Sequence, residues 1–239
     1  MWLGVGRVAA TLVLLSGSFG CGPDAPSEES SLISVGLRTP NSPLISIRIG
    51  FRTGSIDDPP GKNGLNALTA LMMGRGGTQN LNYEEVTRAL YPWAASLTAF
   101  SDKEMTIIVG QVHRDHLEQF YAILRDVILF PRFEESDFDR NREFLTNAVV
   151  SSLRGNDDEE LGKQTLNVLM YEGHPYAAPE IGTEGGLDAI TLQDVREFHT
   201  RQYTRDNFLV GVAGGYPVGF VQEIEDDLTK GLPAGNAVP

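Results

Sequence analysis

Cysteine is almost absent from this 239-residue sequence, which contains Cys21 alone. A single cysteine excludes an internal disulfide, and it gives no support to a thiol nucleophile or a cysteine-ligated zinc site. Basic residues are also scarce, because 19 Lys and Arg stand against 32 Asp and Glu and leave a formal net charge of −13. A chain this acidic is a poor partner for nucleic acid or for an anionic membrane surface. A serine hydrolase has no support either, since no G-x-S-x-G motif occurs.

The N-terminal segment has the pattern of a targeting sequence. Arg7 precedes a largely apolar run, residues 8–15, that is too short to span a bilayer. We therefore interpret residues 1–20 as a signal peptide, and we predict that Cys21 is lipidated because its surroundings resemble a bacterial lipoprotein box. The alternative is an ordinary cleaved signal peptide followed by a free cysteine. Either reading predicts export to the bacterial cell envelope, and the first adds a lipid anchor. Residues 21–31 are rich in Pro, Ser and acid and are predicted to form a tether.

The hydrophobic pattern from residue 32 onward predicts strands and helices in one domain. In residues 44–51, apolar side chains alternate with Ser46, Arg48 and Gly50, which is typical of a half-buried strand. Strands separated by helices indicate an α+β fold, a single domain with a mixed, mainly antiparallel sheet packed against helices over residues 32–230. Residues 231–239 are predicted to start a linker. Further strands are predicted at residues 105–112 and 207–213, and helices at residues 64–73, 115–130, 136–153, 158–171 and from 191 onward.

Five segments, in order, resemble motifs of the insulinase/pitrilysin-type zinc proteases, also called inverzincins. Residues 51–59 are similar to the first strand and the G-S-x-x-(D/E)-x-P turn of that family. Residues 64–78 resemble the segment G-L-A-H-L-L-E-H-M-x-x-x-G-T. Residues 173–183 resemble H-P-Y-G-x-P-x-x-G-T, and residues 187–207 and 212–214 resemble the helix and strand that follow it. The resemblance implies the N-terminal domain of such a protease, whose members carry a second, similar domain.

The metal-binding residues that this resemblance implies are replaced in the sequence. In the family, H-x-x-E-H on a helix supplies two His ligands and a Glu base, and a later helix supplies a Glu ligand. The matching positions here are Ala67, Ala70 and Leu71, with Ser152 or Ser151 at the later ligand. Aliphatic side chains have no lone pair for a metal, and a serine hydroxyl is a poor zinc ligand. We therefore predict no catalytic residue, no metal site and no cofactor, although zinc is expected for the family.

The four histidines do not suggest a substitute site. His113 and His116 lie between a predicted strand and helix, without a recognised ligand spacing, and are expected to be solvated. His174 belongs to the His-Pro-Tyr turn, which the resemblance implies to be structural. His199 is expected to be a polar or partly buried residue of its helix. Glu143 lies near the later ligand position, but one carboxylate alone binds zinc weakly.

These observations lead to one preferred function and two alternatives. The preferred hypothesis is a catalytically inactive domain that acts as the non-catalytic half or subunit of an envelope zinc peptidase. Its partner would be a zinc-bearing subunit, in a heterodimer, or a second domain, and a peptide substrate would be a further partner. The first alternative is an envelope binding or scaffold lipoprotein without a protease partner. The second is a zinc metalloendopeptidase with non-standard ligands. Nucleic acid is not an expected partner, and a membrane is expected only through the lipid anchor.

Overall fold

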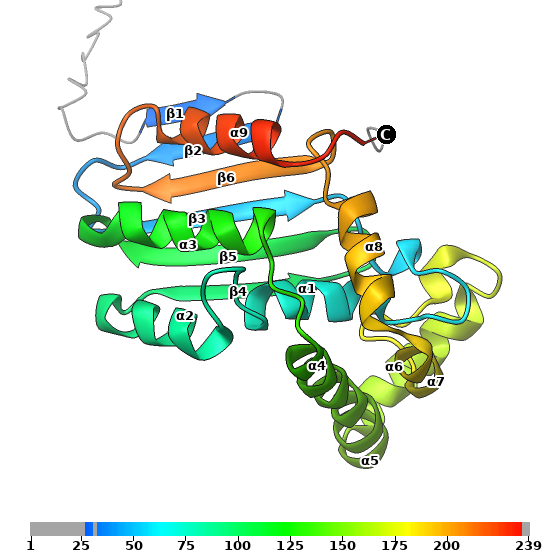
Figure 1. Cartoon of the computed structure of the whole chain (residues 1–239). Coiled ribbons are helices and arrows are strands. Elements are labelled where there is room, and N and C mark those ends of the chain that lie inside the picture. Colours follow the sequence, from blue (N-terminus) through cyan, green and yellow to red (C-terminus); the bar gives the residue numbers. More distant parts are fainter. Residues whose placement is uncertain (1–26, 31–32, 236–239) are drawn as a thin grey trace, which may run out of the picture.

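The predicted strand at residues 44–51 forms over its whole length as β3 (Leu44–Phe51) and lies inside a six-stranded sheet (Figure 1). The computed structural model describes residues 27–30 and 33–235. The strand order is β1-β2-β6-β3-β5-β4, and neighbouring strands are antiparallel except β2 and β6. The predicted mixed, mainly antiparallel sheet is confirmed. The other strands are β1 (Ser27–Ser30), β2 (Ser34–Arg38), β4 (Ser96–Ser101), β5 (Thr106–His113) and β6 (Phe208–Gly214).

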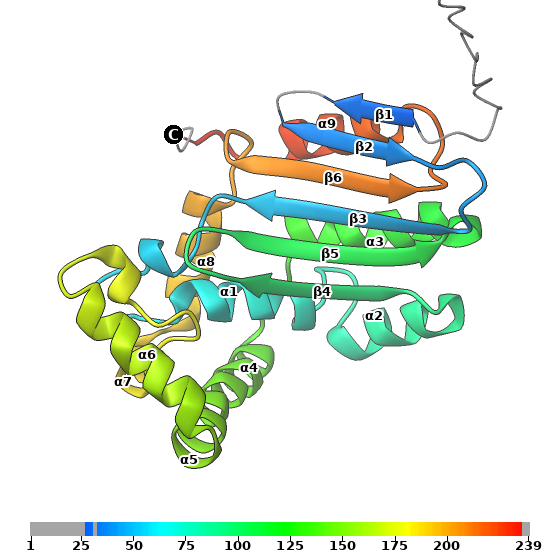
Figure 2. The same cartoon turned by 180° about the vertical axis from the view of Figure 1, so that it is seen from behind.

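Helices cover one face of this sheet. Figure 1 shows α3 and α9 across the strands, with α1 below them, whereas Figure 2 shows the opposite face without a helix from the described residues. Helices α4, α5 and α6 extend away from the sheet as an arm. The helices are α1 (Leu65–Arg75), α2 (Tyr83–Leu90), α3 (Leu117–Leu129), α4 (Glu135–Asn147), α5 (Arg154–Asn156), α6 (Asp158–Met170), α7 (Glu184–Ala189), α8 (Leu192–Gln202) and α9 (Phe220–Gly231), with 3-10 turns η1 (Ser55–Asp57), η2 (Tyr91–Trp93), η3 (Arg114–His116) and η5 (Pro175–Ala177).

The core lies between the sheet and its covering helices. Ile45, Ile47 and Ile49 of β3 are fully buried, because alternate residues of a strand point to the same face. Phe120 of α3 packs directly on Gly110 of β5, where a Cβ would lie 2.7 Å from the ring. Complete burial of side chains of this size stabilises the fold by roughly 1.5–3 kcal/mol each.

The predicted helix at residues 136–153 is interrupted. Helix α4 ends at Asn147, and residues 148–153 form η4 (Ala148–Leu153), a π-helix. The β-branched pair Val149 and Val150 disfavours a regular α-helix, and Ser151 and Ser152 can compete for backbone hydrogen bonds. The later ligand position of the family resemblance therefore falls in a distorted helical segment.

Several expectations concern the ends of the chain. The predicted signal peptide, residues 1–20, and Cys21 lie outside the described residues and stay predictions. Within the segment predicted as a tether, residues 27–30 form β1, which pairs with β2. Helix α9 ends at Gly231, where the sequence predicts the start of a linker. In the part of the chain that the structure describes, no helix combines the length and the apolar character needed to cross a membrane.

Candidate functional site

The N-terminus of α1 is held by a partly buried carboxylate. Asp58 accepts hydrogen bonds from the backbone N–H groups of Gly64 at 2.6 Å and Asn66 at 2.7 Å, which satisfies donors that a helix start leaves free. Burial raises the pKa of Asp58 to about 6, although these two N–H groups act to lower it. Gly64 has a φ of 106°. A Cβ on Gly64 would lie only 3.0 Å from the Cα of Gly182. Glycine is therefore required at this helix start.

The positions that correspond to metal ligands lie along α1. Ala67 and Leu71 are one turn apart on its partly exposed side, and Ala70 is buried beside them. Leu68 and Met72, on the opposite side, are fully buried in the core. Zinc requires imidazole, thiolate or carboxylate donors, and none of the first three side chains has a donor atom. This helix face does not fit a zinc ion.

The second part of the implied metal site comes from the arm. Ser151 is exposed, and its carbonyl accepts a hydrogen bond from Asn156 Nδ2 at 2.6 Å, while the side chain of Ser152 lies outside the described part. Helix α4 still contacts α1, because the Arg140 guanidinium donates to the Arg75 carbonyl at 2.7 Å.

The histidines lie in separate environments, and His113 and His116, which were expected to be solvated, are only partly exposed. His113 pairs with Asp115 at 3.4 Å, and the His116 ring stacks on Trp93. His174 caps η5, where its Nδ1 accepts a hydrogen bond from the Tyr176 N–H at 3.1 Å. Among the described residues, no group of three or more His, Cys, Asp or Glu side chains is arranged to hold a metal ion.

His199 is the one histidine with a strongly perturbed environment in the described part of the chain. Its ring stacks on Tyr203 at 4.9 Å and meets Phe133 edge-on at 5.2 Å. Burial lowers the pKa of His199 to about 4, so the ring is neutral at physiological pH. The expectation of a partly buried helix residue is confirmed, since the side chain is only partly accessible.

Strand β4 forms the sheet edge next to α1, and the sequence analysis missed it. It pairs with β5 on one side, and the sheet order places nothing described on its other side. Gly74 of α1 lies against it, because a Cβ there would be 3.0 Å from the Ala99 nitrogen. A free strand edge can add an extended peptide through backbone hydrogen bonds. The available signal was the alternation of Leu97 and Ala99 with polar residues, which is weak over so short a segment.

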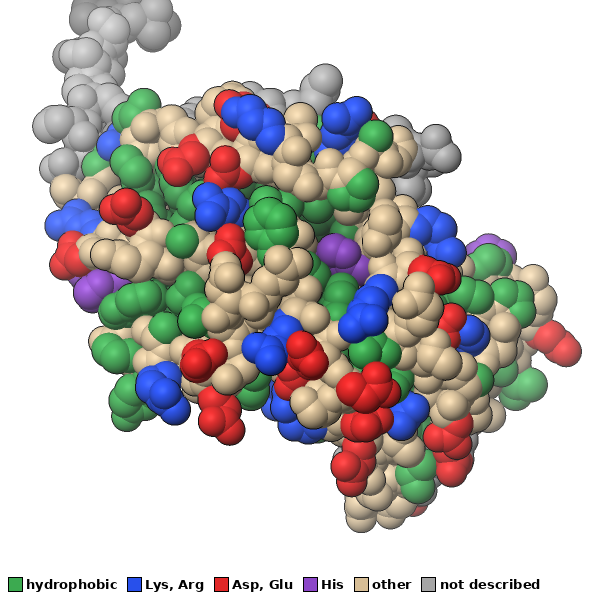
Figure 3. Space-filling model, in the orientation of Figure 1, with side chains coloured by type: hydrophobic (Ala, Val, Ile, Leu, Met, Phe, Trp, Pro, Cys, Tyr) green, Lys and Arg blue, Asp and Glu red, His purple; other side chains and the backbone are tan. Residues whose placement is uncertain are grey.

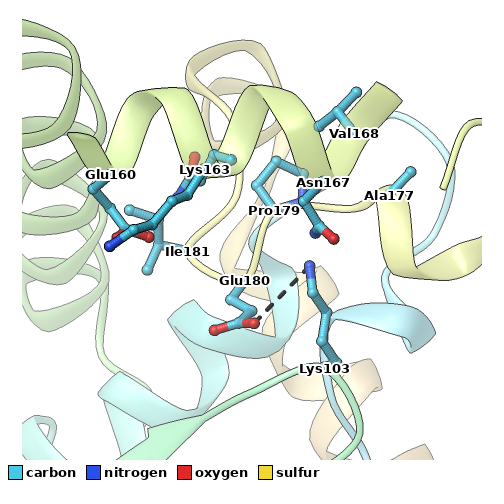
Figure 4. Close-up of a pocket in the computed structure, with 10 residues that line it drawn as sticks. Lys103, Glu160, Lys163, Asn167, Val168, Ala177, Pro179, Glu180 and Ile181 are labelled. Carbon is cyan, nitrogen blue, oxygen red and sulfur yellow. Dashed lines mark ion pairs between the residues drawn. The ribbon is translucent and has the colours of Figure 1, made fainter. Parts of the chain in front are cut away.

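Two hollows lie near the two ends of β4. A groove of about 230 Å³ runs between α2 and the start of β4 and is lined by Tyr83, Tyr91 and Leu97. At the other end, a cavity of about 490 Å³ opens under α6 (Figure 4). There Lys103 faces Glu180 at 4.0 Å. An extended peptide along β4 would pass an apolar, aromatic groove at one end and a charged cavity at the other.

The arm carries a concentration of negative charge. Figure 3 shows acidic side chains gathered over its outer surface. Complementary charges steer association and favour basic partners. The acidic residues of this segment are Glu134, Glu135, Asp137, Asp139, Glu143, Asp157, Asp158, Glu159 and Glu160.

The fold is a six-stranded sheet whose edge strand β4 lies beside α1. The model of the family "Insulinase (Peptidase family M16)" matches residues 35–184. This match covers more than half of the chain, and the chain belongs to the insulinase family. The family expected from the sequence motifs is confirmed.

Relatives of known sequence are named as zinc proteases or processing peptidases. The chain is 24% identical over 190 residues to the uncharacterized zinc protease YmxG of Bacillus subtilis, covering 77% of this chain and 45% of that protein. It is 21% identical over 194 residues to the mitochondrial-processing peptidase subunit beta of Dictyostelium discoideum, covering 80% and 41%. The chain thus spans less than half the length of these relatives.

Solved structures show the same fold. A peptidase M16 inactive domain from Pseudomonas fluorescens superposes with a TM-score of 0.80 at 20% identity, covering 90% of this chain and 52% of that one. A protease from Helicobacter pylori gives a TM-score of 0.76 at 20% identity, covering 90% and 53%. The α+β half-domain predicted from the sequence is therefore confirmed as a fold.

Proposed function

We propose that this chain is a non-catalytic half of an envelope zinc peptidase, which binds peptide and partner while another half carries the metal. The observation that carries this proposal is the α1 face, where Ala67, Ala70 and Leu71 supply no donor atom although Asp58 and Gly64 still fix the helix start. No protein-bound zinc is expected at this face. The segment around Cys21 supports export and a lipid anchor.

The free edge of β4 supports a peptide-binding role. An extended peptide would gain backbone hydrogen bonds there, and its side chains would reach the groove lined by Tyr83, Tyr91 and Leu97. The acidic arm beside it favours basic peptides (Figure 3). Cutting would depend on groups from another half, since the adjacent α1 face has no ligand for zinc.

The uncovered sheet face supports a partner of the same fold. On β2, Val35 is 51% exposed and Leu37 48%, and on β4, Phe100 is 49% exposed. Figure 2 shows these strands from the uncovered side of the sheet. Strands of four to eight residues, about 4.8 Å apart, give this face an area of roughly 600 Å², similar to the roughly 800 Å² that each partner contributes to a standard interface. We assign it to the second insulinase-type half, which would shield these side chains from water.

The test combines zinc analysis with reconstitution. The purified chain, from residue 21 with Cys21→Ser, is analysed for zinc and then mixed with an insulinase-family chain from the same source that carries H-x-x-E-H. We expect less than about 0.1 equivalent of zinc in the isolated chain, no peptide cleavage by it, and chelator-sensitive cleavage by the mixture that exceeds that of the second chain alone. Near-stoichiometric zinc and cleavage by the isolated chain would overturn the proposal.

Variants of the open face identify the interface. Leu37→Glu, on this face, is expected to abolish association with the zinc-bearing chain. Val218→Glu is the matched control, because Val218 is 78% exposed but lies in the loop between β6 and α9. If both variants associate as the unmodified chain does, the open face is not the interface.

A further inference from the structure

Three fully buried polar groups surround the start of α1 without a hydrogen-bond partner in the described part of the chain. They are the Thr53 hydroxyl, the Asn66 amide nitrogen Nδ2 and the Tyr203 hydroxyl. Each belongs to a residue with no exposed surface. They come from different segments, since Thr53 follows β3, Asn66 lies in the first turn of α1 and Tyr203 ends α8.

The residues that carry these groups meet around the Thr106 hydroxyl, at the start of β5. Thr106 Oγ1 lies 3.0 Å from the Thr53 carbonyl oxygen and 3.2 Å from Asn66 Oδ1. Its single hydrogen can serve only one of these acceptors at a time. Burial raises the pKa of Tyr203, whereas the Thr106 hydroxyl acts to lower it, which places the Tyr203 hydroxyl beside Thr106. The residues of the three unpartnered groups therefore gather around one buried hydroxyl.

Leaving such groups unpaired is unfavourable. A buried polar group without a partner has lost its hydrogen bonds to water without replacing them, and folded proteins satisfy such groups with buried waters that make about three hydrogen bonds each. The chemistry of the three groups matches one water molecule. The water would accept from Asn66 Nδ2 and donate to Thr53 Oγ1, while the Tyr203 hydroxyl can take either role. A metal cation is a poorer match, because the Asn66 N–H groups would point toward its positive charge.

We propose that a buried water molecule bridges Thr53, Asn66 and Tyr203 and ties the start of α1 to the sheet and to α8. The water is a structural part of the site, since it holds the helix that carries Ala67 and Leu71. This inference does not depend on the proposed function, because it concerns the isolated chain and needs neither a partner nor a peptide.

A crystal structure of the chain at high resolution tests the proposal directly. We expect a density peak within hydrogen-bond distance of Asn66 Nδ2, the Tyr203 hydroxyl and Thr53 Oγ1. A well-ordered site without such a peak overturns the proposal. Crystals grown in rubidium salt separate a cation from water, because anomalous scattering at the peak would identify a bound cation and would also overturn it.

Stability measurements give a second test, because the same substitution lowers the stability of a hydrated site and raises that of a dry one. If water bridges the groups, Tyr203→Phe removes a hydrogen bond and lowers the folded-to-unfolded ratio about fivefold. If the hydroxyl is dry and unpaired, the same substitution raises the ratio. Tyr91→Phe is the matched control, because Tyr91 is 84% exposed and its hydroxyl already faces solvent. Thr53→Val is expected to show the same loss, and a gain in stability for both variants overturns the proposal.

Discussion

His199 makes the stability of this domain depend on pH in a direction that can be worked out from its surroundings. Its ring lies between Phe133 and Tyr203, and burial lowers its pKa from 6.5 to about 4. Between these values the unfolded chain binds a proton that the folded chain does not. The contribution of the neutral His199 ring to stability is therefore complete above pH 6.5 and is lost as the pH falls toward 4. A shift of this size corresponds to about 3 kcal/mol.

Asp58 changes the stability of the domain with pH in the opposite direction, over nearly the same pH range. Burial raises its pKa from 3.8 to about 6, so between these values the folded chain binds a proton that the unfolded chain does not. The contribution is complete below pH 3.8 and is lost as the pH rises toward 6, again by about 3 kcal/mol. Between pH 4 and 6, the effects of His199 and Asp58 should therefore nearly cancel.

Single substitutions should reveal how Asp58 and His199 each change the stability of the folded chain with pH. We expect Asp58→Asn, which removes the titrating carboxyl, to lose ~3 kcal/mol of stability between pH 6.5 and 4, because the pH dependence of His199 is then no longer offset. His199→Phe should instead gain ~3 kcal/mol as the pH falls from 6 to 4. Urea unfolding at half-unit pH steps measures both. Subtracting the stability-against-pH profile of the unmodified chain removes the contributions of titrating groups that all three proteins share. Parallel profiles for all three would refute this account of both side chains.

Three other outcomes follow from particular contacts. Gly74→Val should destabilise the fold by roughly 1–3 kcal/mol in urea unfolding, because its Cβ would approach the Ala99 nitrogen of β4 at 3.0 Å; unchanged stability would contradict this close approach. Ala67→His with Leu71→His should create a two-histidine site whose zinc uptake by metal analysis exceeds that of the unmodified chain, since residues four apart share a helix face. Phe100→Glu should prevent association with a zinc-bearing partner in sedimentation experiments while changing the stability of the isolated chain by less than about 0.5 kcal/mol, and unimpaired association would exclude β4 from the interface.

Elements with a strong local pattern could be predicted, and those defined by the sheet as a whole could not. The strand with the alternating isoleucines of β3 and the helix that starts after Thr191, α8, both form as the sequence predicts. Strand β4 was missed because its short sequence, SLTAFS, has few large apolar residues, and its place at the sheet edge depends on pairing with β5. Helix α9 was also missed, although Phe220, Ile224 and Leu228 have helical spacing and are buried.

Some residues of the candidate site could likewise be identified from the sequence, and others could not. The replacement of ligands by Ala67, Ala70 and Leu71 was visible in the sequence, because the motif lies within one helical turn or so. The buried group around Thr106 was not, since Asn66 and Tyr203 belong to segments far apart in the chain and meet only after folding. Sequence patterns report chemistry that is local, whereas a polar cluster or an open sheet face depends on tertiary contacts.

We expect different surfaces of this domain to determine metal binding and partner binding. The α1 face offers little to a partner, because Ala67 is small and Leu71 is partly packed against the core. Large exposed apolar side chains occur instead on the uncovered sheet face, at Val35, Leu37 and Phe100, and on α6, at Leu166, Leu169 and Met170. Since the hydrophobic effect scales with buried apolar area, binding energy should come from surfaces of this kind and not from α1. Substitutions in α1 should therefore change metal binding without affecting assembly, and substitutions on the sheet face should do the reverse. A variant of Ala67 that abolished assembly would show that the two roles share one surface.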